Sequence, residues 1–518
     1  MRKRNMNTLD RPWNLLSQSL TENADRTAAR FGDTPHTYRE LDGASAALAD
    51  GLSSTFAVGD RIALLVGNRF EYLVADVAIM RAGLVKVPLN PMLPVQDIIH
   101  ILEHSGARMV LVSSMLSVVT PTLVAKIESA CPAVEVVDVD SPRYAELRSK
   151  AVVTERPVAA ADPAAIYYTG GTTGLPKGVV HSQSSVATNL IAHVLESEIR
   201  RDEVMVLSTA LSHSAGAFAA AGLTRGATLV VLEKFTPELF CAAAARFAAR
   251  WAMVVPTMLY RLLDHLQSSG TPAPALDTFV YGSAPITPSR LKQAIDLFGP
   301  VFIQLFGQTE CPNWGTTLTK DDHRNAADRP ILLESAGRRS AMAGVRVVDD
   351  NGNPLPAGQI GEICLTAPYT LARYHDNPEA TAATLVDGWV HTRDVGYLDD
   401  HGYLFLKDRT SDMIISGGYN VYSSEVEAVI AALPGVVQVT VIGIPDADWG
   451  ESVCAIVVHD RAGAVGEDEF RETCRAALGG YKSPKVVRFV DQIPMTPFGK
   501  ADKKALRAPF WADRNRAI

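Results

Sequence analysis

The chain has 518 residues, of which 47% are hydrophobic and 20% are charged, and its formal net charge is -8. This balance excludes a largely disordered chain, and the acidic excess argues against a nucleic-acid partner. The six cysteines show no metal-ligand or CxxC spacing, and we find no secretory h-region and no apolar run of about 18 residues. We therefore expect a cytoplasmic protein without a membrane span, whose cysteines are reduced and mostly buried.

Apolar runs of strand length alternate with amphipathic stretches of helix length through most of the chain. The predicted strands cover residues 62–66, 85–89, 109–113, 204–209, 228–233, 251–255, 278–282 and 301–307. The predicted helices cover residues 70–79, 95–104, 237–249, 258–266 and 288–298. Continuous Val/Ile/Leu strands alternating with helices are typical of α/β architecture with largely parallel sheets.

The pattern changes after residue 340. Short strands and turn signals up to residue 407 predict a mostly antiparallel β-rich subdomain. The remainder reads as a small α+β unit with helices at 425–433 and 467–478 and strands at 437–443, 454–459 and 486–490. We therefore predict an N-terminal domain of residues 1–408 and a C-terminal domain of residues 409–518. The N-terminal domain is expected to contain subdomains of about 1–150, 160–335 and 336–408.

Residues 166–178, IYYTGGTTGLPKG, have the composition of a phosphate-binding loop. Glycines allow close approach of the backbone to an anion, and successive N–H groups form an anion-binding nest. Threonine hydroxyls add hydrogen bonds, and Lys177 adds a positive charge. The string does not match GxxxxGK[ST], since Leu175 and Gly178 stand at two of its required positions, so this is a phosphate loop of another kind.

The string TGGTTGLPKG resembles the signature loop of the adenylate-forming (ANL) superfamily, and in particular its acyl-CoA and aryl-CoA synthetases. Gly170 stands where the family usually has Ser or Thr. Further segments that resemble family motifs follow in the expected order: YGSAPI (281–286), FGQTE (306–310), HTRDVGYLDDHGYL (391–404), KDRTSDMIISGGYNVYSSEVE (407–427) and PMTPFGKADKKAL (494–506). The resemblance implies a large domain followed by a small mobile lid, with ATP, Mg²⁺ and coenzyme A as cofactors.

The resemblance also implies roles for individual residues. It makes Lys500, Glu310 and Thr169 catalytic and Glu310 the Mg²⁺ ligand, because a carboxylate oxygen suits that ion. Phe306 would stack on adenine, and Asp394 would accept hydrogen bonds from the ribose hydroxyls, reinforced by Arg409. The full ATP- and AMP-binding set is Thr169, Gly170, Gly171, Thr172, Thr173, Gly174, Lys177, Gly282, Ser283, Ala284, Phe306, Gly307, Gln308, Thr309, Asp394, Arg409 and Lys500.

The acyl pocket, the lid hinge and the CoA site are also assigned by resemblance. The predicted acyl pocket contains His213, Ala217, Gly282, Gly307, Cys311 and Asn313. Ser411 is the predicted hinge, and Gly417, Gly418, Trp449 and Tyr481 are the predicted CoA contacts. Residues 210–223 contain no Asp to pair a substrate ammonium, which disfavours an amino-acid substrate. We expect a bulky alicyclic, aromatic or medium-chain carboxylic acid, although the alanines of this segment are equally compatible with simple helix packing.

The predicted reaction joins a carboxylate to the α-phosphate of ATP with release of pyrophosphate and then transfers the acyl group to CoA. Three departures from the family pattern lie at the domain junction: Arg393, Asp408 and Ser411. The alternative is therefore an enzyme that forms the adenylate alone and passes the acyl group to a carrier protein or a partner enzyme. A nucleotide-binding protein without activity is the third reading. The sequence leaves the oligomeric state open, with a homodimer among the alternatives.

Overall fold

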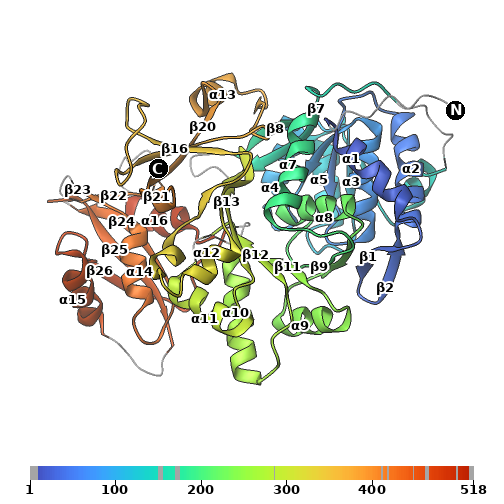
Figure 1. Ribbon diagram of the computed structural model, residues 1–518. Coiled ribbons are helices and arrows are strands. Elements are labelled where there is room, and N and C mark those ends of the chain that lie inside the picture. Colours follow the sequence, from blue (N-terminus) through green and yellow to red (C-terminus); the bar gives the residue numbers. More distant parts are fainter. Residues whose placement is uncertain are drawn as a thin grey trace.

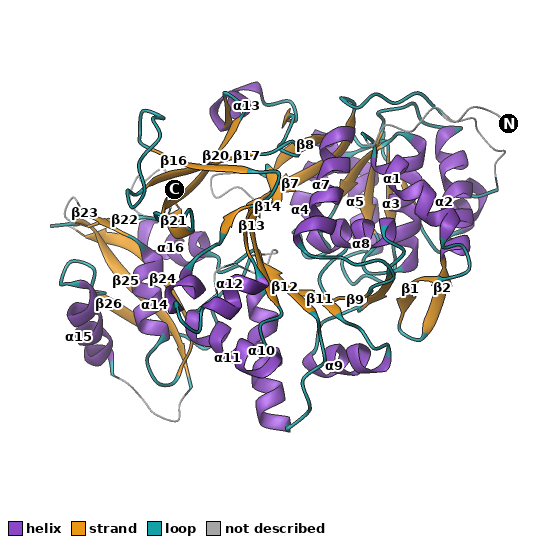
Figure 2. Ribbon diagram, viewed as in Figure 1, coloured by secondary structure: helices purple, strands orange, loops and turns teal. Residues whose placement is uncertain are grey.

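The computed structural model describes residues 10–149, 156–169, 175–284, 286–409, 412–416, 419–446, 448–460, 466–496 and 500–512. Figures 1 and 2 show a larger body formed by the first four-fifths of the chain and a smaller C-terminal lobe beside it. The body contains two large sheets and a smaller antiparallel sheet, and the lobe contains a fourth sheet. Among the described residues, no helix is both long and apolar enough to cross a bilayer.

The first large sheet contains seven strands, five of which run parallel. In spatial order they are β18 (Arg373–Tyr374), β8 (Lys177–Ser182), β7 (Pro163–Thr169), β4 (Val85–Pro88), β3 (Arg61–Leu65), β5 (Met109–Val112) and β6 (Glu135–Asp138). β8 and β18 continue the parallel run as antiparallel strands. Val, Ile and Leu dominate β3 and β5, as expected for strands that are buried on both faces.

The second large sheet contains nine strands. In spatial order they are β15 (Arg338–Arg339), β14 (Cys311–Leu318), β13 (Phe302–Gln308), β12 (Thr278–Gly282), β11 (Trp251–Val254), β9 (Val204–Leu207), β10 (Thr228–Val231), β1 (Thr27–Phe31) and β2 (Thr34–Thr37). The run from β13 to β1 is parallel, and antiparallel hairpins close both ends.

Helices separate and cover the two sheets in alternating layers. The helices packed in the layer between the sheets are α1 (Pro12–Glu22), α2 (Tyr38–Ser53), α3 (Phe70–Ala82), α6 (Pro142–Leu147), α7 (Gln183–Glu196) and α8 (Ser214–Thr224). The outer face of the first sheet carries α4 (Val95–Ser105) and α5 (Pro121–Ala130). The outer face of the second carries α9 (Pro237–Arg246), α10 (Pro256–Ser269), α11 (Pro288–Phe298), α12 (Lys320–Asn325) and the 3₁₀ turn Pro330–Glu334.

The β-rich region and the C-terminal lobe complete the fold. The antiparallel sheet contains β16 (Gly344–Val348), β17 (Gly361–Thr366), β19 (Leu385–Val386), β20 (Trp389–Leu398) and β21 (Leu404–Arg409), with α13 (Pro378–Thr384) beside it. The lobe contains β22 (Ile414–Ser416), β23 (Tyr419–Val421), α14 (Ser423–Ala431), β24 (Val436–Asp446), β25 (Gly450–His459), α15 (Glu467–Leu478), β26 (Val486–Phe489) and α16 (Lys503–Trp511).

The predicted α/β class is confirmed, and each strand and helix predicted by residue range has a counterpart. The two sheets nevertheless do not follow the predicted subdomain ranges. β7 and β8 belong to the first sheet, although they lie in the predicted 160–335 subdomain, and the β1–β2 hairpin belongs to the second sheet. Local hydrophobic periodicity indicates where strands occur but not which strands pair. The division at residue 408 stays a prediction.

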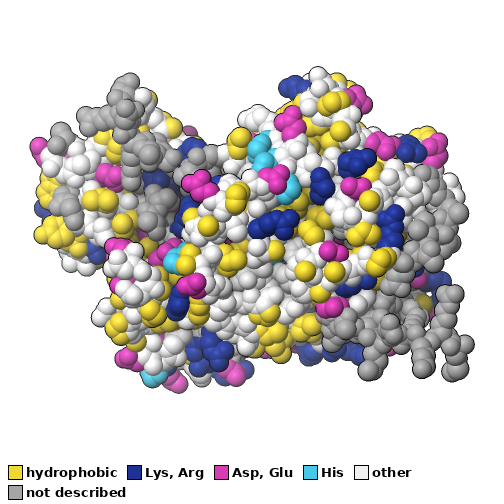
Figure 3. Space-filling view, turned by 90° about the horizontal axis from the view of Figure 1, so that it is seen from above, with side chains coloured by type: hydrophobic (Ala, Val, Ile, Leu, Met, Phe, Trp, Pro, Cys, Tyr) yellow, Lys and Arg dark blue, Asp and Glu magenta, His cyan; other side chains and the backbone are white. Residues whose placement is uncertain are grey.

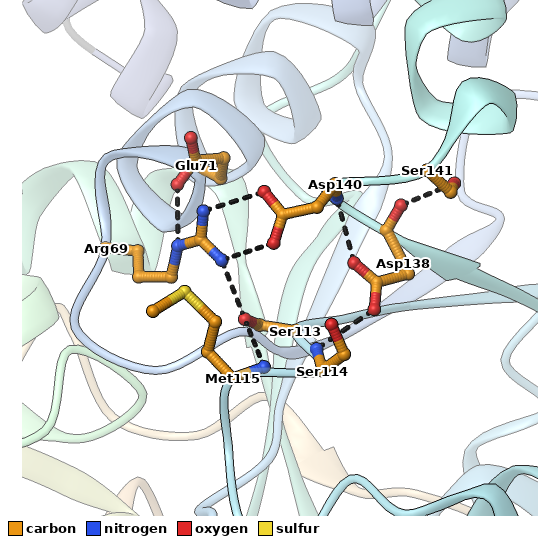
Figure 4. Close-up of polar contacts among 8 residues, drawn as sticks. All are labelled: Arg69, Glu71, Ser113, Ser114, Met115, Asp138, Asp140 and Ser141. Carbon is orange, nitrogen blue, oxygen red and sulfur yellow. Dashed lines mark hydrogen bonds and ion pairs between the residues drawn. The ribbon is translucent and has the colours of Figure 1, made fainter.

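The carboxyl ends of the parallel strands meet in a network of hydrogen bonds (Figure 4). Arg69, which follows β3, donates to both carboxylate oxygens of Asp140 at 2.6 and 2.9 Å and to Ser113 Oγ at 2.9 Å. The preceding Asn68 reaches the second sheet, where its carboxamide donates to the carbonyls of Thr209 and Leu232. The loop after β3 therefore connects the carboxyl ends of both sheets.

A buried ion pair provides a test of this packing. Lys86 Nζ on β4 lies 2.7 Å from Asp76 Oδ1 on α3, and both side chains are at most 10% exposed. Lys86→Met would leave a buried carboxylate without its cation, so we predict a loss of about 3 to 5 kcal/mol in the free energy of unfolding, measured by urea denaturation. Arg39→Met, which breaks the exposed pair with Asp25, is the control and should cost about 1 kcal/mol or less. Equal losses in the two variants would contradict the prediction.

Candidate active site

The predicted phosphate loop connects two paired strands of the first sheet. β7 ends at Thr169 and β8 begins at Lys177, and these residues are Cα partners in the antiparallel ladder. The ladder therefore holds Thr169 and Lys177 side by side at the base of the loop. Five predicted contacts lie outside the described residues: Gly170, Gly171, Thr172, Thr173 and Gly174.

Glu310 lies in the tight connection between β13 and β14, and its side chain is buried. Tyr374 Oη donates to Glu310 Oε1 over 2.5 Å. Burial raises the pKa of Tyr374 and the neighbouring Glu310 raises it further, so the phenol keeps its proton and acts as a donor. Lys177 Nζ lies 5.9 Å from the centroid of the same ring. Tyr374 thus contacts both a cation at the phosphate loop and the predicted metal ligand.

The surroundings of Glu310 fit a Mg²⁺ ion shared with nucleotide phosphates. Magnesium prefers oxygen ligands and in such sites takes one or two protein carboxylates together with phosphate oxygens. The hydrogen bond from Tyr374 fixes the orientation of Oε1. Oε2 is then the carboxylate oxygen that would coordinate the ion. The ion would neutralise phosphate charge when bound.

His181 on β8 connects the phosphate-loop strands to the turn that carries Glu310. Its Nε2 lies 2.8 Å from the carbonyl oxygen of Thr309, and its Nδ1 lies 3.1 Å from Ser185 Oγ. Burial lowers the pKa of His181 to about 4, so the ring is neutral at physiological pH. Since a carbonyl oxygen only accepts, Nε2 carries the proton and donates to Thr309.

The predicted adenine contacts lie at the ends of two adjacent strands. β12 and β13 run parallel, with Gly282 beside Leu305. Neither glycine of this region has room for a side chain: a Cβ on Gly282 would lie 2.6 Å from the Leu305 carbonyl oxygen, and one on Gly307 would lie 2.6 Å from that of Cys311. The structure thus brings together Gly282, Ser283, Ala284, Phe306, Gly307, Gln308 and Thr309.

Asp394, the predicted ribose contact, lies on β20 opposite Arg409 on β21, and the two are Cα partners. Glu362 on β17 holds the preceding residues in place. Its Oε1 accepts from Arg393 N at 2.9 Å, and its Oε2 lies 2.7 Å from His391 Nδ1. Arg393 adopts the left-handed conformation with φ 61°, which non-glycine residues rarely occupy. Glu362 therefore stabilises the backbone that presents Asp394.

One group of three potential metal ligands was found among the described residues, formed by Glu362, Cys364 and His391. Direct hydrogen bonds already join Glu362 to His391 and to the Arg393 amide. Arg346 lies opposite Cys364 in the ladder, so a cation already stands beside the thiol. We interpret the group as support for Asp394 rather than as a metal centre.

Lys500 lies beside His213 at the boundary between the lobe and the body. Its backbone N–H donates to Thr496 Oγ1 at 3.2 Å. Desolvation lowers the pKa of His213, and the Lys500 ammonium lowers it further. His213 is nevertheless exposed to solvent. Figure 3, which views the molecule from above, shows Lys and Arg side chains along parts of the furrow between the lobe and the body.

The predicted acyl-pocket residues differ in burial: His213, Ala217 and Asn313 keep some exposure, whereas Cys311 is buried. His213 and Ala217 lie at the start of α8 and keep some exposure, while most of the other small residues of α8 are buried in the core. These buried residues therefore pack the helix rather than line a pocket. Cys311 is fully buried within the core as well, which raises the pKa of its thiol to about 12. Asn313 is partly exposed.

The predicted hinge and part of the predicted CoA site, namely Ser411, Gly417 and Gly418, lie outside the described residues. Trp449 and Tyr481 are both 37% exposed on the lobe. Lys485 Nζ lies 4.5 Å from the centroid of the Trp449 ring, and Tyr419 lies beside Tyr481 with ring centroids 5.3 Å apart. The lobe thus exposes aromatic rings next to lysine side chains.

Sequence reasoning did not select three residues that position the site: His181, Glu362 and Tyr374. Each lies at least 29 residues from the partner it holds: His181 is 128 residues from Thr309, Tyr374 is 64 from Glu310, and Glu362 is 29 from His391. No spacing pattern connects such pairs. Glu362 meets His391 through strand pairing, whereas His181 and Tyr374 reach Thr309 and Glu310 where the two large sheets pack together. His181, three residues after Gly178, was the nearest available signal.

Comparison with protein families decides the class. The model described as AMP-binding enzyme matches residues 16–375, and the model described as AMP-binding enzyme C-terminal domain matches residues 425–500. The chain belongs to the AMP-binding enzyme family. Within the adenylate-forming superfamily it falls in the acyl- and aryl-CoA synthetase branch, and it is an enzyme of the acid–thiol ligase class.

Relatives of this AMP-binding enzyme are similar over nearly their whole length. It is 34% identical to medium/long-chain-fatty-acid–CoA ligase FadD8 of Mycobacterium tuberculosis, covering 97% of this chain and 91% of that protein. It is 34% identical to feruloyl-CoA synthase of Amycolatopsis sp, covering 93% and 96%. It is 32% identical to fatty acid–[acyl-carrier-protein] ligase ScoC of Streptomyces coeruleorubidus, covering 93% of each. The solved structure of the amide bond synthetase McbA from Marinactinospora thermotolerans superposes with TM-score 0.87 at 29% identity, covering 96% and 100%.

The hydrogen bond from Tyr374 to Glu310 can be tested directly. Tyr374→Phe removes a donor from a buried carboxylate, so we predict a KM for MgATP that is about 10-fold higher or more. Pyrophosphate exchange titrated with MgATP measures it. Tyr144→Phe is the matched control, because the Tyr144 hydroxyl is buried without a hydrogen-bond partner in the described part of the chain. An unchanged KM in Tyr374→Phe would contradict this role.

Proposed function

We propose that this enzyme activates a carboxylic acid with ATP to form an acyl-adenylate and pyrophosphate, and then transfers the acyl group to the thiol of coenzyme A, releasing AMP. The observation that carries the proposal is the position of Lys500, which lies close enough to His213 to lower the pKa of that imidazole. The Lys500 ammonium therefore lies near the N-terminal end of α8, where the acid is expected to bind.

The first step must overcome repulsion between two anions. The carboxylate oxygen attacks the α-phosphorus, the bond to the bridging oxygen breaks, and pyrophosphate leaves with that electron pair. Lys177 and Lys500 supply positive charge, and Glu310 would hold Mg²⁺ together with the phosphates. Phe306 and the backbone at Gly282 and Gly307 would receive the adenine, while Asp394 and Arg409 would contact the ribose.

The second step forms the thioester. The thiol sulfur attacks the acyl carbon, the bond to the adenylate oxygen breaks, and the thiol proton is lost to solvent while AMP leaves. Trp449, with Lys485 beside it, suits a ligand that carries both a base and phosphates. FadD8 and feruloyl-CoA synthase are named as CoA ligases, which supports CoA as the acceptor.

The acid is proposed to be a bulky alicyclic, aromatic or medium-chain acid. The names of FadD8 and feruloyl-CoA synthase cover aliphatic and aromatic acids. A second candidate is adenylation followed by transfer to a carrier protein or another acceptor. The names of ScoC, an acyl-carrier-protein ligase, and McbA, an amide bond synthetase, support this candidate because neither acceptor is CoA. Incubation with acid, ATP and CoA discriminates the two, because only the first candidate accumulates an acyl-CoA thioester.

Lys500→Ala tests the adenylation step. We predict that it lowers acid-dependent ATP–pyrophosphate exchange by at least about 100-fold, because one preorganised charge at the reacting groups is lost. Nucleotide binding, measured by calorimetry, should change by less than about 10-fold. Lys504→Ala removes an exposed lysine from the neighbouring helix and serves as the control. Full exchange activity in Lys500→Ala would refute the assigned role.

Trp449→Ala tests the CoA assignment. Loss of a stacking surface should raise the KM for CoA about 10-fold, while pyrophosphate exchange without CoA stays the same. Phe489→Ala, which truncates another exposed aromatic side chain of the lobe, should change neither value. If Trp449→Ala leaves thioester formation unaffected, the CoA nucleotide binds elsewhere.

A further inference from the structure

Asn313 occupies an unusual position beside the predicted acyl pocket. It follows the turn that carries Glu310 and adopts a left-handed conformation with φ 63°. Its backbone packs on Gly307, where an added Cβ would lie 2.9 Å from both Asn313 N and Asn313 C. Its side chain is partly exposed, although the neighbouring Cys311 and Trp314 are completely buried. Asn313 and the preceding Pro312 therefore form a partly exposed step between two buried residues.

The hydrogen bonds around Asn313 fix the direction of its carboxamide. His193 Nδ1 lies 2.7 Å from the carbonyl oxygen of Asn189, which only accepts, so Nδ1 carries the proton. Burial lowers the pKa of His193 to about 4, so the ring is neutral and Nε2 is an acceptor. Asn313 Nδ2 lies 2.8 Å from Nε2 and therefore donates to it. The carboxamide cannot rotate to present its oxygen to His193.

This arrangement leaves the carboxamide oxygen directed away from His193. In the part of the chain that the structure describes, no protein donor bonds Asn313 Oδ1. The His193 ring packs on Phe218 of α8, with ring centroids 4.7 Å apart. His213 begins the same helix five residues earlier and faces Lys500. At 1.5 Å per residue, Phe218, on which the His193 ring packs, lies roughly 7 Å along the axis of α8 from His213.

We propose that Asn313 Oδ1 accepts a hydrogen bond from a hydroxyl or N–H group on the body of the acid, so that this enzyme selects a carboxylic acid bearing a donor several atoms from its carboxylate. The inference rests on the proposed function and narrows its substrate class. An acid without such a hydroxyl or N–H group leaves Asn313 Oδ1 without a hydrogen bond from the substrate in a partly buried site. A donor-bearing acid should therefore be preferred by roughly 10- to 100-fold in kcat/KM.

Matched acids test the proposal on the unaltered enzyme. Each set contains a hydroxy acid, the acid lacking the hydroxyl, and its methyl ether, which keeps the oxygen but removes the donor. Phenylpropenoic acids with a ring hydroxyl and medium-chain acids with a terminal hydroxyl cover both substrate types. Pyrophosphate exchange gives kcat/KM for each acid. We expect the hydroxy acid to exceed both analogues in at least one set. Equal values throughout every set overturn the inference.

Asn313→Gly assigns the effect to this residue. Glycine accepts the left-handed conformation without strain, so the variant removes the carboxamide and preserves the turn, which thermal unfolding verifies. We expect the ratio of kcat/KM for the hydroxy acid to kcat/KM for its unsubstituted analogue to fall to about one, whatever the change in the two values together. A preference that survives in Asn313→Gly overturns the inference.

The two proposals fail in different ways. If no acid in a broad panel supports pyrophosphate exchange, the proposed function fails and this inference fails with it. If acids are activated but donor-bearing ones have no advantage, only the inference fails.

Discussion

The hydrogen bond from His181 to the Thr309 carbonyl joins the two halves on which the site depends. His181 belongs to the hairpin that closes the phosphate loop, and Thr309 precedes Glu310 in a hairpin of the other large sheet. The contact is buried, and burial keeps the imidazole neutral. The Thr309 carbonyl then fixes the tautomer in which Nε2 carries the proton and donates it. Tyr374 adds a second connection across the same boundary. These contacts hold the strand that begins at Lys177 and the turn that carries Glu310 together at the candidate site.

The backbone is strained at three places in the candidate site. Ser283, Asn313 and Arg393 all have positive φ, although none is glycine. Each such residue costs about 1 to 2 kcal/mol, and strain of this kind concentrates at functional sites. At Arg393 the compensation is visible, since Glu362 accepts its amide hydrogen. At Asn313 the side chain is held by His193. The site is therefore preorganised by contacts outside the motifs that resemble the family.

The sequence predicted where the strands and helices lie better than it predicted which strands pair and which side chains meet. The run 301–307 and the motif FGQTE identified β13 and Glu310, because a buried strand has a continuous apolar pattern. It did not predict that β7 and β8 join the first sheet, since β7 enters it by pairing with β4, whose partner residue Lys86 lies far from Ala165 along the chain. The same limit hid Tyr374, which is 64 positions from Glu310. The alanines of α8 were ambiguous for another reason: small residues suit helix packing and an open pocket alike, and only burial separates the two.

The central claim is that a carboxylate oxygen of the acid becomes bonded to the α-phosphorus of ATP. An acid labelled with ¹⁸O in both carboxylate oxygens, turned over with ATP, Mg²⁺ and CoA, tests it most directly by mass spectrometry of the products. The account predicts AMP carrying one ¹⁸O atom for each acid converted, because the bond to phosphorus survives when the thiol displaces AMP. Unlabelled AMP, or label recovered in inorganic phosphate with ADP as the nucleotide product, would contradict it.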